Sequence, residues 1–111
     1  MKTERHSQWL RGVLDLCVLG LLAEGESYGY RLGQALEDAG LGTIRGGTLY
    51  PVLLRLERGG LIAARWSEGD AGPARKYYRL TPPGKRELRA AAGEWADFTR
   101  RVSAVLEEVE Q

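Results

Sequence analysis

The sequence predicts a mainly α fold of the α+β class, and three observations carry the prediction. Apolar residues recur at helical spacing in three segments before Gly59-Gly60. Two short runs, Leu61 to Trp66 and Arg75 to Leu80, flank a polar stretch that contains glycine and proline, which is typical of a hairpin. A long amphipathic segment then follows Thr81. The expected order is helix, helix, helix, hairpin, long helix.

Composition limits the class of protein. The chain has 111 residues, room for one compact domain and an extra element, and its 43% hydrophobic content is ordinary for a soluble protein. The single cysteine, Cys17, excludes a disulfide framework or a cysteine-based metal site within one chain. The most apolar stretch, Val13 to Ala23, is too short to span a bilayer and carries Asp15, and no signal-peptide core precedes it. We therefore expect a soluble, cytoplasmic protein with no membrane partner, metal or cofactor.

The net charge of +1 hides a polarised distribution. Seven basic and three acidic residues lie between Arg45 and Arg79, a local balance of +4, so the remainder totals about −3 and ends in the acidic stretch Glu107-Glu108-Val109-Glu110. The basic residues are Arg45, Arg55, Arg58, Arg65, Arg75, Lys76 and Arg79. Such polarity suits a protein with one face toward DNA.

The first helix is predicted from about Gln8 to Glu24, with Gly25 ending it in a left-handed turn. Its stripe consists of Leu10, Val13, Leu14, Cys17, Val18 and Leu21. Leu16, Leu19 and Leu22 add apolar surface outside that stripe. A helix of this kind is buried on more than one side, in part by a partner.

Ser27 is the expected N-cap of the second helix, which runs to about Ala39. One face of that helix is formed by Tyr28, Leu32, Ala35, Leu36 and Ala39. Gly40 and Gly42 then break the pattern, and Thr43 to Gly46 form a connector.

Gly47 or Thr48 is expected to cap the third helix, where Pro51 is tolerated in the first turn. Its core stripe is Leu49, Val52, Leu53 and Leu56, with Thr48, Pro51, Arg55 and Arg58 on the opposite side.

The hairpin is predicted from strands Leu61 to Trp66 and Arg75 to Leu80, joined by the loop Ser67 to Ala74. Tyr77 and Tyr78 must point to opposite faces, and the sequence does not say which is buried. Thr81 then caps a helix to about Glu108, roughly 40 Å long at 1.5 Å per residue. Its apolar stripe is Ala92, Trp95, Thr99, Val102, Leu106 and Val109, widened by Ala91, Phe98 and Val105. A stripe that extends beyond a small core needs a partner, and dimerisation is the simplest one.

Three helices followed by a hairpin form a winged helix-turn-helix, in which the helix after the turn enters the DNA major groove. Residues 8–80 would form this domain, and residues 81–109 a C-terminal dimerisation helix. The N-terminal N–H groups of the third helix can bind phosphate, and Gly46-Gly47 would let the backbone approach closely. Arg75 and Lys76, after the hairpin tip, are placed for phosphates or the minor groove.

The motifs themselves resemble those of the PadR family of bacterial transcription regulators, from about Leu10 to Leu88. They are Leu10-Arg11-Gly12, Gly29-Tyr30, Gly47-Thr48-Leu49-Tyr50-Pro51, Leu56-Glu57, Gly60-Leu61-Ile62, Arg75-Lys76-Tyr77-Tyr78 and Leu80-Thr81. The Gly-Thr-Leu-Tyr-Pro and Arg-Lys-Tyr-Tyr stretches are highly specific together.

The resemblance implies a homodimeric repressor of the compact branch, which has a single C-terminal helix and no separate ligand domain. It binds double-stranded DNA at a pseudo-palindromic operator. The implied DNA-facing residues are Tyr30, Gly47, Thr48, Tyr50, Arg75 and Lys76. The helical wheel adds Arg55 and Arg58. Tyr28 stands where the family often has histidine, and its role stays open.

The dimer interface is expected at Leu16, Leu19, Ala92, Trp95, Thr99, Val102 and Leu106. Two interpretations fit Trp95. It is either a packed residue of the dimer core, or, with its symmetry mate and with Trp9 or Phe98, it lines a cleft at the dimer interface for a planar aromatic effector. Some compact family members use tryptophan in the second way.

No catalytic constellation is predicted. His6 lies in a polar N-terminal stretch without a partner for metal or proton transfer. Ser27 and Thr48 are better explained as caps than as nucleophiles, and Cys17 as a buried small hydrophobe rather than a redox sensor. The alternative to DNA binding is a winged-helix protein-interaction module.

Overall fold

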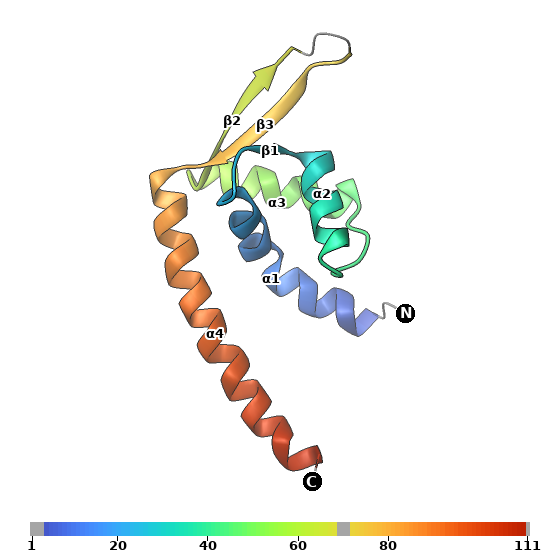
Figure 1. Ribbon diagram of the computed structural model, residues 1–111, viewed down its shortest axis with the longest axis vertical. Coiled ribbons are helices and arrows are strands. Elements are labelled where there is room, and N and C mark those ends of the chain that lie inside the picture. The colour runs from blue at the N-terminus through green and yellow to red at the C-terminus, as the bar shows by residue number, and fades with distance from the viewer. Residues whose placement is uncertain (1–3, 69–71, 111) are drawn as a thin grey trace.

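Three helices, a small antiparallel sheet and a long C-terminal helix follow one another along the chain (Figure 1). The computed structural model describes residues 4–68 and 72–110. The elements are α1 (Glu4–Leu22), β1 (Ser27–Tyr28), α2 (Gly29–Asp38), α3 (Gly46–Arg58), β2 (Ile62–Ser67), β3 (Arg75–Leu80) and α4 (Pro82–Glu110). The predicted winged helix-turn-helix order is confirmed, and the hairpin tip at residues 69–71 lies outside the described part.

The core lies where α1, α2 and α3 meet the inner face of the sheet. The predicted stripe of α3 is fully buried there, with Leu53 and Leu49 at its centre. Ile62, Tyr78 and Leu80 contribute from the sheet. The rest of the core is Leu14, Val18, Leu19 and Leu22 of α1, Leu32 and Leu36 of α2, and Val52 and Leu56 of α3. The apolar stripes of the three helices and the inner face of the sheet therefore form one core.

The sheet has a third strand that the sequence did not predict. Its order is β1-β3-β2, and β1 pairs with β3 through Ser27 to Tyr78 and Tyr28 to Tyr77. The prediction of Ser27 as the N-cap of α2 is wrong, because Ser27 is buried in β1 and Tyr28 occupies the cap position without a side-chain hydrogen bond. Tyr28 is likewise outside the core face of α2 and only half-buried. Pairing with β3 decides the conformation of this segment.

The pairing of the hairpin strands decides which of the two adjacent tyrosines, Tyr77 or Tyr78, is buried. Strands β2 and β3 pair in antiparallel register from Ile62 opposite Leu80 to Ser67 opposite Arg75. Because successive side chains point to opposite faces, Tyr78 lies in the core and Tyr77 lies half-buried on the outer face. The outer face thus carries polar and aromatic groups.

Two helix starts differ from the predicted ones. Helix α1 begins at Glu4 and ends at Leu22, so His6 belongs to a helix, where its Nε2 lies 3.0 Å from the carbonyl oxygen of Leu41. This contact replaces the predicted solvated tail. Helix α3 begins at Gly46, with Arg45 rather than Gly47 or Thr48 as its N-cap. The Arg45 carbonyl accepts the N–H groups of Thr48 and Leu49, both at 2.9 Å, so Thr48 stands inside the first turn.

Helix α4 starts at a fixed junction with the core. Thr81 is the predicted cap, since its Oγ1 accepts the N–H of Gly84 at 3.1 Å and donates to the Gly60 carbonyl at 2.6 Å. The helix is about 43 Å long at 1.5 Å per residue. Its C-terminal part extends away from the other elements in a molecule of 59 × 33 × 20 Å (Figure 1). In the described part of the chain, no helix is both long and apolar enough to cross a membrane.

Candidate nucleic-acid interface

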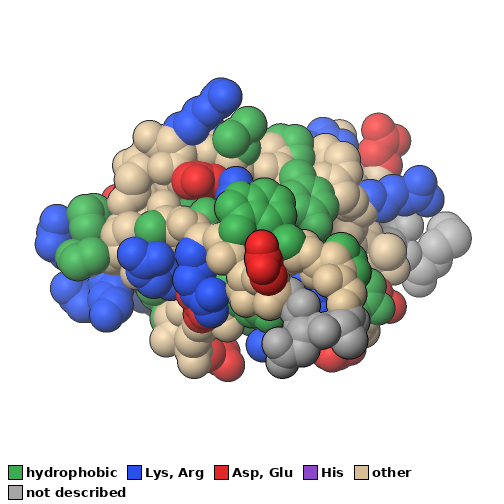
Figure 2. All heavy atoms as spheres, turned by 90° about the horizontal axis from the view of Figure 1, so that it is seen from above, with side chains coloured by type: hydrophobic (Ala, Val, Ile, Leu, Met, Phe, Trp, Pro, Cys, Tyr) green, Lys and Arg blue, Asp and Glu red, His purple; other side chains and the backbone are tan. Residues whose placement is uncertain are grey.

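A groove of about 590 Å³ separates α3 from the wing formed by β2 and β3. Four of the predicted DNA-facing residues line it, namely Tyr30, Tyr50, Arg75 and Lys76. The other lining residues are Tyr28, Gly29, Leu54, Glu57, Trp66, Ala74 and Tyr78. Figure 2 looks onto this end of the molecule and shows hydrophobic side chains gathered at its centre, with Lys and Arg side chains around them and a few acidic side chains beside them. The groove offers rings for stacking and cations for phosphate.

Tyr50 is positioned by the close approach of two glycines. A Cβ added to Gly29 would lie 2.4 Å from the Tyr50 hydroxyl, and one added to Gly46 would lie 3.2 Å from its ring. The ring therefore lies across the first residue of α2, with about half of its surface exposed. The tyrosine is a bridge between the two helices of the helix-turn-helix.

The outward face of α3 is less basic than the helical wheel suggested. Gly47, Pro51, Leu54 and Arg58 follow one another at spacings of four and three, which places them on one face. All four are exposed, and Leu54 retains 45% of its surface. Sequence reasoning missed Leu54 because a leucine in a helix is normally assigned to the core.

Lys76 already has a partner inside the groove. Its Nζ lies 3.1 Å from Oε1 of Glu57 on α3, and it also lies over the Tyr78 ring at 5.5 Å. The hydrogen bond to Glu57 raises the pKa of Lys76. Burial raises the pKa of the Tyr78 hydroxyl. The wing is thus tied to α3 by an ion pair that a phosphate would have to share.

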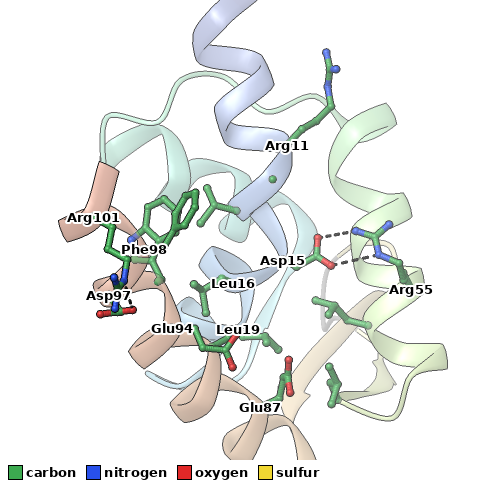
Figure 3. Close-up of a pocket in the computed structure, with 16 residues that line it drawn as sticks. Arg11, Asp15, Leu16, Leu19, Arg55, Glu87, Glu94, Asp97, Phe98 and Arg101 are labelled. Carbon is green, nitrogen blue, oxygen red and sulfur yellow. Dashed lines mark hydrogen bonds and ion pairs between the residues drawn. The ribbon is translucent and has the colours of Figure 1, made fainter. Parts of the chain in front are cut away.

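Arg55 of α3 is engaged by α1. Its guanidinium donates to Asp15 of α1 through Nη2 at 2.6 Å and Nε at 3.3 Å (Figure 3). Arg55 does not line the groove between α3 and the wing, so the structure does not bring it together with Tyr50, Arg75 and Lys76 as the prediction of a shared DNA-facing surface required. Helical periodicity predicted that the Arg55 side chain points away from the core. It could not predict the ion pair with Asp15, which lies 40 residues earlier in the chain.

Comparison with known proteins places the chain in a family. Residues 18–90 match the transcriptional regulator PadR-like family. The chain belongs to the PadR family. Transcriptional regulator Rv3488 of Mycobacterium tuberculosis is 38% identical over 95 residues, 86% of this chain and 87% of that protein. PadR-family members are transcription regulators and not enzymes.

Solved structures of PadR proteins share this fold. A PadR family regulator from Eggerthella lenta has a TM-score of 0.81 and 41% identity, over 90% of this chain and 87% of that chain. Bacillus subtilis PadR in complex with operator DNA has a TM-score of 0.66 and 30% identity, over 72% of this chain and 46% of that chain. The Bacillus subtilis chain is about twice as long as the part matched.

A second groove, of about 800 Å³, lies between α1, α3 and α4 of this PadR-family protein (Figure 3). Leu16, Trp95 and Phe98 give it apolar walls, and the Trp95 and Phe98 ring centroids are 6.2 Å apart. Acidic and basic residues surround these walls, namely Arg11, Asp15, Arg55, Glu87, Glu94, Asp97 and Arg101. Of the two residues predicted to accompany Trp95, Phe98 lies beside it in this groove, and Trp9 does not line the groove.

The predicted dimer residues divide into two groups. Leu19 is only 2% exposed and belongs to the core of its own chain, so it offers no surface to a partner. Trp95, Val102 and Leu106 are all more than 40% exposed, and Ala92 is exposed beside them. Thr99 is half-exposed and donates through Oγ1 to the Ala96 carbonyl at 3.1 Å. Phe98, Val105 and Val109 enlarge the exposed apolar surface of α4.

Proposed function

We propose that the chain binds double-stranded DNA in a sequence-specific way, with α3 in the major groove and the wing beside it. The groove between α3 and the wing carries this proposal, because it gathers Tyr30, Tyr50, Arg75 and Lys76 from three separate elements. Gly47, Thr48 and Arg58 on α3 complete the surface. The operator complex of the similar Bacillus subtilis PadR supports the same use of the fold.

A mobility-shift assay with DNA from upstream of the gene tests this function. Thr48→Ala, Tyr50→Ala and Lys76→Ala together are expected to weaken binding at least a hundredfold, because three contacts of about 1 kcal/mol or more are removed. Arg86→Ala, an exposed change near the start of α4, is the matched control. Undiminished operator binding by the triple variant would contradict the proposed surface.

The chain acts, on this proposal, as a cytoplasmic homodimeric repressor. The exposed apolar stripe of α4 supports the dimer, since residues 81–109 extend beyond the DNA-binding domain of residues 8–80 and a solvated stripe of this size is unfavourable. Two copies of α3 would read a pseudo-palindromic operator with half-sites about one helical turn, or a multiple of it, apart. DNase footprinting should show two protected half-sites, and transcription of the downstream gene in vitro should fall on adding the protein.

A second function, effector binding, is favoured by one observation. The groove beside Trp95 and Phe98 has apolar walls and a volume in the range of small-molecule sites. A planar aromatic compound stacked there would contact α1, α3 and α4 at once. In a variant with Trp9→Phe and Trp66→Phe, Trp95 is the one tryptophan left, and adding planar aromatic compounds should quench its fluorescence. The control variant carries Trp66→Phe and Trp95→Phe and keeps Trp9. Equal quenching in the two variants would exclude this site.

The mobility shift also separates DNA binding from a protein-interaction module. Binding to DNA must weaken as salt rises, because phosphate contacts release counterions. A chain that shifts no DNA but binds another protein independently of salt would be an interaction module instead.

A further inference from the structure

The outer face of the sheet carries a stack of rings and guanidiniums. The Tyr28 and Tyr77 rings meet edge to face with centroids 5.3 Å apart. Arg31 of α2 and Arg75 of β3 both lie over the Tyr28 ring, 4.9 and 4.5 Å from its centroid. Arg65 of β2 lies over Tyr77 at 4.9 Å. Three cations therefore share two adjacent rings.

These three arginines differ in whether a carboxylate neutralises their charge. Arg65 donates two hydrogen bonds to Glu26, at 2.6 and 2.8 Å, and this contact lowers the pKa of the Glu26 carboxyl. Within residues 4–68 and 72–110, no carboxylate pairs with Arg31 or Arg75. Their guanidiniums lie within about 10 Å of each other, about one Debye length at 0.1 M salt. An anion that contacts both would relieve their repulsion.

One of these two arginines, Arg75, lines the interface groove, and Arg31 contacts the Tyr28 ring at the side of that groove. Tyr28 and Arg75 line that groove together with Tyr30 and Lys76. Arg31 follows Tyr30 directly on α2 and contacts Tyr28 from there. Arginine is suited to a phosphate because its planar N–H groups can donate to two oxygens at once. Because Arg75 lines the groove that is proposed to bind DNA, the anion expected at these two arginines is a phosphate of the DNA backbone rather than a free small anion.

We propose that Arg31 and Arg75 hold one backbone phosphate of DNA between them, with the Tyr28 ring as the platform that positions both guanidiniums. The proposal rests on the proposed DNA-binding function and adds Arg31 and Tyr28 to its residues. It joins α2 to the wing through the DNA backbone. We name the three residues Tyr28, Arg31 and Arg75 the phosphate clamp. Arg65 is not part of it, because the carboxylate of Glu26 already neutralises the charge of Arg65.

The salt dependence of binding tests the phosphate clamp. A short mixed-sequence duplex labelled with fluorescein is sufficient as the probe, because phosphate contacts do not depend on sequence. Arg31→Gln and Arg75→Gln are each expected to weaken binding several-fold. The double variant should lower the slope of log affinity against log salt by about one, the value for a single phosphate. Its loss should also be smaller than the two single losses combined, since both side chains share one phosphate.

Arg65→Gln is the matched control, since it removes an arginine that also lies over a tyrosine ring but is paired with Glu26. It should leave the salt slope unchanged. Tyr28→Phe keeps the platform and should preserve the non-additivity, whereas Tyr28→Leu should abolish it. Circular dichroism on each variant shows whether the wing still folds.

The outcomes separate the two proposals. If the parent chain shows no salt-dependent binding to any duplex, both the DNA-binding function and the phosphate clamp are overturned. If the parent binds but Arg31→Gln and Arg75→Gln behave like Arg65→Gln, the phosphate clamp alone is overturned.

Discussion

Two glycines determine where Tyr50 lies at the groove. Gly29 and Gly46 leave no space for a side chain between α2 and the tyrosine ring, so the ring packs directly on the backbone. At Gly29 the backbone is not in the left-handed region, which means that alanine is conformationally allowed. The small size of Gly29 therefore serves the position of Tyr50 more than the conformation of α2.

Gly29→Ala is expected to displace Tyr50 and to weaken DNA binding about as much as Tyr50→Ala. Stability should change by less than about 1 kcal/mol, because the atom in the way is the end of a flexible side chain and alanine favours the helix. DNA affinity and thermal unfolding measure the two effects. In a Tyr50→Ala background, Gly29→Ala should cost no further affinity, and an additive loss would contradict the explanation.

Glu57 places a negative charge in a groove that is proposed to receive phosphate. Glu57→Gln removes this charge and the ion pair that holds Lys76. DNA affinity at low salt should rise a few-fold, and the pKa of Lys76 should fall because its main upward cause is lost. Glu24→Gln, an exposed change outside the groove, is the control in the same titration. Equal affinities for the two variants would show that Glu57 does not oppose binding.

Cys17 is a small, partly buried residue, which favours its interpretation as a hydrophobic residue over that as a redox sensor. It packs against the core, and burial raises the pKa of its thiol, so less thiolate is present near neutral pH. Iodoacetamide at pH 8 should therefore modify the folded chain much more slowly than the urea-unfolded chain. Equal rates for the folded and unfolded chains would contradict this assignment.

At the scale of elements, the start of α4 connects the wing to the long helix. The Thr81 hydroxyl caps α4 and holds the Gly60 carbonyl, while the Thr81 N–H donates to the Leu61 carbonyl at 3.1 Å. Gly84 is packed so closely that an added Cβ would lie 1.9 Å from the Leu61 oxygen. The junction therefore sets the direction in which α4 leaves the core.

Thr81→Ala should destabilise the chain by about 1 kcal/mol, the usual cost of losing an N-cap. Thr81→Ser keeps the hydroxyl and should recover most of that loss. Urea unfolding of the three proteins is the measurement. A serine variant no more stable than the alanine variant would show that the hydroxyl is not what stabilises the junction.

Gly84→Ala should cost about 2 kcal/mol, because the new methyl group meets backbone rather than a side chain that can move. Gly93→Ala is its control within the same helix, since no atom lies within 4 Å of the added Cβ. That change should stabilise α4 by roughly 0.5–1 kcal/mol. If both variants unfold at the same urea concentration, the close contact at Gly84 is not rigid.

At the scale of the whole molecule, α4 has apolar side chains that no other element of the described chain covers. The C-terminal part of α4 extends away from the core (Figure 1). Val102, Val105 and Leu106 belong to the last third of this helix, and all are exposed. Since they contribute little to the fold of a single chain, a charge placed among them tests association without disturbing the core.

Leu106→Lys is expected to convert the proposed homodimer into a monomer and to weaken operator binding, because two linked DNA-binding units become one. Sedimentation equilibrium measures the mass, and circular dichroism should show that the helices remain. Ala104→Lys lies on the opposite side of α4 and should leave the dimer intact. Unchanged mass for Leu106→Lys would remove this stripe from the dimer interface.

The sequence by itself determined the order of the elements, the core stripe of α3, the Thr81 cap and the PadR family. These features depend on local periodicity, on capping chemistry and on motifs within a few residues, so they are visible in one dimension. The groove residues Tyr30, Tyr50, Arg75 and Lys76 were predicted for the same reason, since each lies in such a motif.

Only the tertiary structure decided which distant side chains meet. Strand β1 has two residues, too few for a period, and exists because β3 pairs with it. Arg55 turns to Asp15, and Leu19 is buried within its own chain instead of facing a partner. The stack of Arg31 and Arg75 on Tyr28 joins α2, β1 and β3. In each case the outcome depends on packing between segments far apart in the chain, which no local pattern encodes.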